Sequence, residues 1–108
     1  MTWPLLRGRV YEAELGDYGR KYYLVVSNNA RNRNLDSALA VRLTTSPKPP
    51  LPSIVELTVQ AERFHGRVVC DDIVEIFVDD ALHRDLGALS PAQMRAVESG
   101  LKAALGIR

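Results

Sequence analysis

The chain has little cysteine and no strong charge of either sign. Cys70 is its single cysteine in 108 residues, so neither a disulfide framework nor a zinc cluster can form within one chain. This cysteine usage fits a reducing cytoplasm. The formal net charge is +1, so any binding of nucleic acid would have to come from a local patch rather than from a global basic field.

Long apolar runs are also missing. No run approaches the length that spans a membrane, and the opening MTWPLLR is too short and too interrupted by proline to be a signal peptide. Internal repeats and low-complexity segments are absent. Because hydrophobic residues make up 46% of the chain, it can bury a real core. We therefore expect one domain over residues 1–108, located in the cytoplasm and not in a membrane.

The usual signatures of metal and nucleotide sites are absent as well. His65 and His83 lie in separate predicted loops without metal-ligand spacing, and both are interpreted as surface histidines. The sequence contains no P-loop and no nucleophile elbow. The pair Asp71-Asp72 could bind a cation, but we expect the commoner role of a turn or strand-end cap. Cys70 lies in an apolar run and is interpreted as an inert core thiol. No cofactor is expected.

Strand patterns dominate most of the chain. Alternating or continuously apolar segments predict short strands, and the five apolar residues at 22–26 indicate a central strand covered on both faces. The strands are expected over residues 9–15, 22–26, 38–44, 53–59, 67–70 and 73–78, with a short extended piece at 86–89. The connections are expected to be a polar loop at 28–34, a proline-rich connector at 46–52, a polar turn at 60–66, and one helical turn at 79–84 capped by Asp79.

The C-terminal end carries the clearest local signal. Ser90-Pro91-Ala92-Gln93 is a capping box with proline at the first helical position, and Gly106 is a natural stop. Leu89 and Met94 occupy the positions of a hydrophobic staple. The apolar stripe of this helix comprises Met94, Val97, Leu101, Ala104 and Leu105. Gly100 costs roughly 1 kcal/mol relative to alanine, so it is interpreted as a point of close approach by another backbone. Together the elements predict a mainly β (α+β) fold of six to seven short strands with one long C-terminal helix.

Two groups of phosphate-seeking side chains flank the predicted second and third strands. Arg20 and Lys21 precede the second strand, whereas Thr44 and Thr45 end the third. Cations and hydroxyls of this kind bind anionic oxygens. They suit the cleavage of RNA by its own 2′-hydroxyl, which needs no protein nucleophile and no metal. The protein must align the attack, stabilise the phosphorane and move protons.

The polar segment between these strands has two interpretations. Residues 28–34 contain four asparagines and two arginines, a composition that cannot build a core. The segment is either a solvated connector or a contact surface for a polyanion, and composition alone does not separate the two. On the third strand, Arg42 and Thr44 are displayed together if the face of Leu39, Val41 and Leu43 is core.

The order of these motifs resembles the MazF/PemK/Kid family of toxins from bacterial toxin–antitoxin pairs. No single motif is specific, but the series covers nearly the whole chain in order. It comprises Arg7-Gly8-Arg9-Val10-Tyr11, the turn Gly19-Arg20-Lys21, Leu24-Val25-Val26-Ser27-Asn28-Asn29, Val41-Arg42-Leu43-Thr44-Thr45-Ser46, Val55-Glu56-Leu57, Leu86-Gly87, Leu89-Ser90-Pro91 and Ala104-Leu105-Gly106.

The resemblance implies a compact SH3-like or CcdB-type β-barrel and a homodimer. It implies a metal-independent, sequence-preferring endoribonuclease that leaves 2′,3′-cyclic phosphate and 5′-hydroxyl ends. The RNA, which could be mRNA, tRNA or rRNA, would lie in a groove across the dimer interface. A cognate antitoxin would occupy the same groove. Protein grooves read single-stranded or loop RNA more readily than duplex RNA, which hides its base edges.

The family's catalytic pair falls on two positions of this chain. The family's Arg before the second strand corresponds to Lys21, with Arg20 beside it, and its Thr corresponds to Thr44. Tyr22 stands where a Pro usually follows that Arg, and Asp71-Asp72 stands where Asp-Gln is common. These departures leave open whether Lys21 or Arg20 is the working cation.

We expect the RNA to be contacted from the turn, the polar segment and the end of the third strand. Tyr18, Tyr22 and Tyr23 could stack on bases, although at least one of Tyr22 and Tyr23 is expected in the core. The predicted RNA-binding residues are Tyr18, Gly19, Asn28, Arg31, Asn32, Arg33, Arg42, Thr45 and Ser46.

Two other functions remain open on the same sequence, because a fold does not determine a function. One is a non-enzymatic binder, either a CcdB-like topoisomerase poison or a catalytically weak RNA-binding relative. The other is a small structural or partner-binding β domain without a ligand. Cleavage of naked RNA in EDTA would separate both of them from the nuclease.

Overall fold

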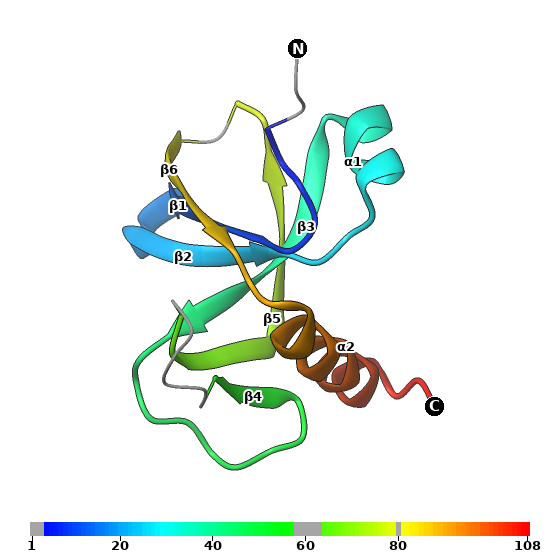
Figure 1. Cartoon of the computed structure of the whole chain (residues 1–108). Helices are drawn as coiled ribbons and strands as arrows, with labels where there is room; N and C mark the ends of the chain where they lie inside the picture. The colour runs from blue at the N-terminus through cyan, green and yellow to red at the C-terminus, as the bar shows by residue number, and fades with distance from the viewer. Residues whose placement is uncertain (1–3, 58–63, 80) are drawn as a thin grey trace.

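The computed structural model of the chain describes residues 4–57, 64–79 and 81–108. Six strands form one antiparallel sheet in the order β4-β5-β3-β2-β1-β6, with two helices packed on it (Figure 1). The mainly β fold with a C-terminal helix is confirmed. The elements are β1 (Arg9–Glu14), the 3₁₀ turn η1 (Gly16–Tyr18), β2 (Arg20–Val25), α1 (Asn29–Leu35), β3 (Ser37–Thr44), β4 (Ile54–Leu57), β5 (Gly66–Phe77), β6 (Ala81–Ala88) and α2 (Pro91–Leu105).

The long strand β5 bends the sheet. Val69 of β5 pairs with Arg42 of β3, but the next pair joins Ile73 to Val41, so residues 70–72 bulge out of the ladder. A bulge of this kind bends a strand and increases its twist. As a result, the first half of β5 pairs with both β3 and β4, whereas the second half pairs with β3 alone (Figure 1).

The bend divides the buried side chains into two clusters. One cluster lies between the sheet and α2 and includes Leu24, Val41, Val68 and Val97. The other includes Tyr11, Tyr23, Val25 and Ile76. Since Tyr23, Leu24 and Val25 are consecutive and all buried, β2 is covered on both faces, as expected for a central strand.

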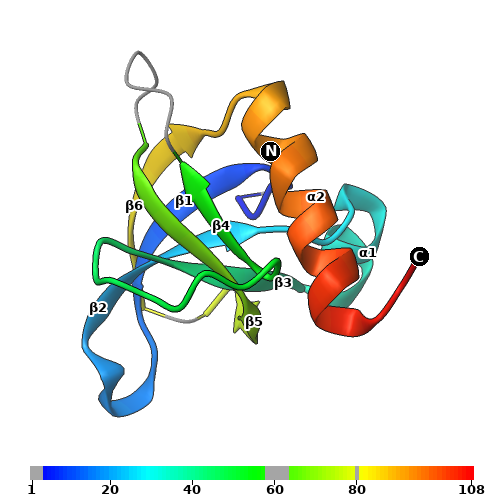
Figure 2. The same cartoon turned by 90° about the horizontal axis from the view of Figure 1, so that it is seen from below.

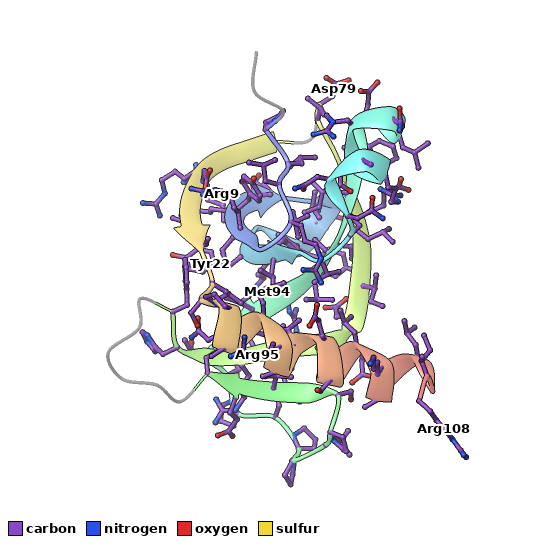
Figure 3. The ribbon with its side chains drawn as sticks, turned by 45° about the vertical axis from the view of Figure 1, so that its right-hand side comes forward. Arg9, Tyr22, Asp79, Met94, Arg95 and Arg108 are labelled. Carbon is purple, nitrogen blue, oxygen red and sulfur yellow. The ribbon has the colours of Figure 1, made fainter. Side chains whose placement is uncertain are left out.

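The helix α2 begins and ends where the local signals place it. The Ser90 hydroxyl accepts a bond from the Gln93 N–H (3.1 Å), and the Gln93 side chain accepts one from the Ser90 N–H (3.2 Å). The chain leaves the helix through Gly106 in the left-handed conformation. Met94 lies between α2 and the sheet (Figure 3), but the prediction for Leu105 was wrong, because 58% of this residue is exposed.

Gly100 is a point of close approach, as predicted, although the two nearest neighbours are side chains and the backbone carbonyl of Pro52 lies farther away, at 3.6 Å from an added Cβ. A Cβ at this position would lie 2.6 Å from Val55 Cγ2 and 2.8 Å from Cys70 Sγ. Both distances are shorter than atoms tolerate, so alanine cannot enter without a shift of these groups. Gly100 therefore lets α2 lie directly against β4 and β5.

Two connections differ from the prediction. The segment 28–34, expected as a loop, forms α1, with the Asn28 side chain accepting the Arg31 N–H at 2.8 Å as an N-cap. In the helical turn expected at 79–84, residues 81–84 instead form the beginning of β6, whose pairing with β1 overrides the local signal, and residue 80 lies outside the described residues. Residues 58–63, which include the end of the strand expected to reach Val59 and most of the turn expected at 60–66, lie outside the described residues.

The expectation that Asp71-Asp72 forms a turn or a strand-end cap was wrong. Both residues lie inside β5, at the bulge. The Asp71 carboxylate accepts a hydrogen bond from the Ser53 hydroxyl at 2.6 Å, and Asp72 forms an ion pair with Arg42 at 3.5 Å. The two strands expected on either side of this pair are therefore one strand with an interrupted ladder.

Candidate active site

An open cavity of about 580 Å³ lies where β2 begins and β3 ends. Its apolar floor is formed by Leu43 and Phe64, which are buried, and by half-buried Leu86. We call it the strand-end cavity. Its remaining lining residues carry cations, hydroxyls, an imidazole and a phenol; they are Arg20, Lys21, Tyr22, Thr44, Thr45, Ser46 and His65.

Sheet register brings Lys21 and Thr44 together. Tyr22 of β2 pairs with Leu43 of β3, and the two strands are antiparallel. Lys21 precedes Tyr22 and Thr44 follows Leu43, so both lie at the end of this ladder, and both line the strand-end cavity. The predicted cation and the predicted hydroxyl are thus brought to one cavity although 23 positions separate them.

The end of β3 is held in place by its neighbours. The Ser46 N–H donates to Thr44 Oγ1 at 3.1 Å, and the Arg67 guanidinium donates to the carbonyls of Thr45 and Ser46, at 3.4 Å each. Because Thr44 Oγ1 accepts the backbone N–H, its own O–H can still donate to a ligand oxygen. The hydroxyl is therefore oriented before any ligand binds.

The two adjacent cations differ in their surroundings. Arg20 forms an ion pair with Glu14 at 3.6 Å, but the Arg20 side chain is 61% exposed, so the pair contributes little to stability. Lys21 forms no ion pair with a carboxylate in the described part of the chain. Its ammonium group is therefore available to an anionic ligand in the cavity that Thr44 also lines.

A smaller cavity of about 180 Å³ contains other predicted contact residues. Tyr18, Tyr23 and Arg42 line it together with Leu15, Asp72 and Val74. Tyr23 is buried and burial raises the pKa of its phenol, whereas Tyr22 is 40% exposed, which confirms that one of this pair is core. Figure 3 shows Tyr22 on the outside of the sheet. Gly19 adopts a positive φ of 73° in the turn before Arg20 and lines neither cavity.

The predicted contact residues of α1 are not brought to this site. Figures 1 and 2 both place α1 on the opposite side of the molecule from the tip of the β1–β2 hairpin. Asn28 is the N-cap, and Asn32 is fully buried, donating to the carbonyls of Leu5 and Ser27. Arg31 donates to the Ser37 carbonyl at 3.1 Å, whereas Arg33 is exposed.

Four lining residues were not among the predicted site residues: Leu43, which was expected only in the core, and Phe64, His65 and Leu86. His65 was interpreted only as a surface histidine, and it is indeed exposed. It reaches the cavity because Arg67, two residues later, pairs with Thr44 in the β3–β5 ladder. No local pattern links positions 65 and 44, so only sheet pairing could reveal this.

Outside the two cavities, the features relevant to function are the single thiol, possible metal ligands and the length of the helices. Cys70 is fully buried, and burial raises the pKa of its thiol to about 11, in agreement with an inert core thiol. No group of three or more His, Cys, Asp or Glu among the described residues could hold a metal ion. No helix in this part of the chain is long and apolar enough to cross a membrane.

Comparison with known families identifies the chain's relatives. The family model of the PemK-like, MazF-like toxins of type II toxin–antitoxin systems matches residues 6–105. The chain belongs to this toxin family. It is 42% identical over 102 residues to the endoribonuclease MazF1 of Mycobacterium bovis and to the endoribonuclease MazF4 of Mycobacterium tuberculosis. In each case the match covers 94% of this chain and 93% of the relative.

Solved structures of the family share the fold. A mycobacterial endoribonuclease solved in complex with its cognate antitoxin is 41% identical and superposes with a TM-score of 0.85, covering 95% of this chain and 96% of its own. A MazE–MazF complex from Deinococcus radiodurans is 21% identical, with a TM-score of 0.76 and full coverage of both chains. At that identity the likeness concerns the fold alone.

Proposed function

We propose that this MazF/PemK-family toxin is a metal-independent, sequence-preferring endoribonuclease. It cuts single-stranded or loop RNA by attack of the substrate's 2′-hydroxyl, and so inhibits translation and growth. The products carry a 2′,3′-cyclic phosphate and a 5′-hydroxyl. The observation that supports the proposal is that Lys21 and Thr44 line one cavity, at the beginning of β2 and the end of β3. The endoribonuclease names of its mycobacterial relatives support it.

The strand-end cavity suits one nucleotide and its phosphate. The apolar floor and the exposed Tyr22 ring offer stacking surfaces for a base. At the rim, the Lys21 ammonium and the Thr44 hydroxyl can donate to the phosphate oxygens, on which negative charge accumulates in the phosphorane. Arg20 adds a second cation beside Lys21. Because these groups project from paired strands, they are positioned before the substrate arrives.

The proposed partners follow from the family. A cognate antitoxin is the protein partner, since a mycobacterial relative that is 41% identical was solved in complex with one. We further propose a homodimer, with RNA in a groove between the protomers. Exposed apolar side chains such as Ile73 (37%) and Phe77 (48%) on β5 leave surface that a second protomer can cover.

Cleavage of total RNA in the presence of EDTA tests this proposal. We expect the purified chain to produce discrete cuts with 5′-hydroxyl ends, mapped by sequencing of the 5′ ends. Thr44→Ala and Lys21→Ala should each lower the cleavage rate by about 100-fold or more, because each removes a donor to the developing charge.

The matched control is Lys102→Ala, which removes one exposed lysine from the last turn of α2, away from both cavities. It should cleave at the rate of the unmodified chain. Folded protein that cuts no RNA in EDTA would overturn the nuclease, and an assay for topoisomerase poisoning would be the next step. Full activity of Lys21→Ala would remove only its catalytic role.

A further inference from the structure

We propose that His65 is the general base of the cleavage reaction. This inference rests on the proposed function and assigns one further catalytic residue within the same cavity. The attack of the 2′-hydroxyl needs a proton acceptor, and an imidazole is the side chain that most often supplies one. His65 lines the cavity with both Lys21 and Thr44.

The backbone on both sides of His65 is anchored. Before it, the Phe64 ring is buried and the Phe64 carbonyl accepts a hydrogen bond from Gln93 Nε2 of α2 at 3.3 Å. After it, Gly66 lies so close to the Thr44 carbonyl that an added Cβ would be 2.6 Å from that oxygen. His65 is therefore held between α2 and the end of β3, while its own imidazole is exposed.

The chemistry of the lining favours histidine for this role. The titratable or charged side chains of β2 that face the cavity are Arg20, Lys21 and Tyr22. Arg67 lies beside them on β5, against the carbonyls of Thr45 and Ser46. Groups of these types keep their protons below about pH 9, whereas imidazole has an ordinary pKa of about 6.5 and exchanges a proton near neutrality.

The proton balance of the step is complete. Neutral His65 takes the proton of the 2′-hydroxyl as the 2′-oxygen forms its bond to phosphorus. The bond between phosphorus and the 5′-oxygen then breaks, and the departing oxygen takes a proton from the Lys21 ammonium. Thr44 donates a hydrogen bond to a phosphate oxygen throughout. Exchange with water afterwards returns the proton of His65 to solvent and restores that of Lys21.

This assignment fixes the sign of the pH dependence. Only the neutral imidazole can accept the proton, so the single-turnover rate should rise about tenfold per pH unit in acid and level off above the pKa of the base. The carboxylates nearest to the cations of this site are Glu14, which pairs with Arg20, and Glu56, which pairs with Arg67, at 3.6 Å each. A rising limb between pH 5 and 8 that is lost in His65→Gln therefore belongs to His65.

The test compares His65→Gln with the unmodified chain on a short single-stranded RNA of the mapped sequence, from pH 5 to 8 in EDTA. Glutamine keeps a polar side chain of similar reach but cannot titrate. We expect a loss of about 100-fold at pH 7.5 and a flattened pH profile. Added imidazole should restore part of the activity of His65→Ala. His83→Gln, which changes the only other histidine, should keep the full rate and profile.

Three results would overturn the assignment. One is a His65→Gln variant with the rate and rising limb of the unmodified chain. The second is a slower variant that retains that limb, which would make His65 a binding residue. The third is failure of imidazole to restore activity in folded His65→Ala. If the unmodified chain itself cuts no RNA, the proposed function fails instead, so the two failures are distinguishable.

Discussion

At the residue scale, Gly66 shows how one position controls the geometry of the site. Its φ is +96°, a conformation that side-chain-bearing residues rarely adopt, and an added Cβ would lie 2.6 Å from the Thr44 carbonyl oxygen. The close approach keeps His65 beside the end of β3. No larger residue could bring these two segments equally near.

We expect Gly66→Ala to lower the free energy of unfolding by about 2 kcal/mol or more, since backbone strain and a steric clash add together. Cleavage should fall as well, because Thr44 and His65 are pushed apart. Urea unfolding and the RNA assay measure the two effects. Gly16→Ala is the control: its φ is also positive (56°), but a Cβ there would contact nothing within 4 Å. Equal destabilisation by the two variants would contradict the role of the clash.

At the scale of elements, α2 combines strong local signals with a contact that reaches the site. The capping box of Ser90 and Gln93 starts the helix, and the Gln93 side chain also donates to the Phe64 carbonyl. The buried face includes Val97 and Gly100. The helix thus supports the segment that leads into His65.

Ser90→Ala should lower the free energy of unfolding by about 1 kcal/mol, because the N–H of Gln93 loses its acceptor. Ser90→Gly should cost only a few tenths of a kcal/mol, since glycine is tolerated at this position. Chemical denaturation of both variants checks the order. If alanine were as well tolerated as glycine, the observed 3.1 Å cap bond would contribute nothing to stability.

At the scale of the whole molecule, the predicted RNA contacts separate into two regions. Arg20 and Lys21 lie at the strand-end cavity, whereas Arg33 lies on α1 at the other side of the molecule (Figure 2). With a net charge of +1, the chain offers no general attraction for RNA. Binding must then depend on the particular cations that touch phosphates.

The salt dependence of binding identifies those cations. The constant K for RNA binding is measured in a Thr44→Ala background, which prevents cleavage. There we expect Arg20→Ala to reduce the slope of log K against log salt concentration by about 0.7, which is the value for one phosphate contact on a single strand. Arg33→Ala, which leaves the hydrogen bonds of Arg31 intact, should not change the slope. A smaller slope in Arg33→Ala would extend the RNA path to α1 and support the contacts predicted there from the sequence.

Much of the fold could be predicted because its signals are local. The capping box at Ser90, the stop at Gly106 and the apolar residues that mark β1 and β3 as strands can be read from neighbouring residues alone. The sequence-based interpretation of residues 28–34 as a loop was wrong because the Asn28 cap and the packing of α1 on β3 outweigh a composition that disfavours helix. The beginning of β6 was missed because its strand form depends on pairing with β1.

The candidate site, like the fold, has a part that the sequence predicted and a part that only the folded structure revealed. The order of the motifs pointed to Lys21 and Thr44 and to the toxin family, because residue types and their order can be read from the sequence without knowledge of the fold. The separation of α1 from the cavity and the presence of His65 in the same cavity as Lys21 and Thr44 came from the folded sheet. Pairing of β3 with β2 and β5 brings the segments that carry these residues together, and contacts between residues so distant in the chain leave no trace in local sequence.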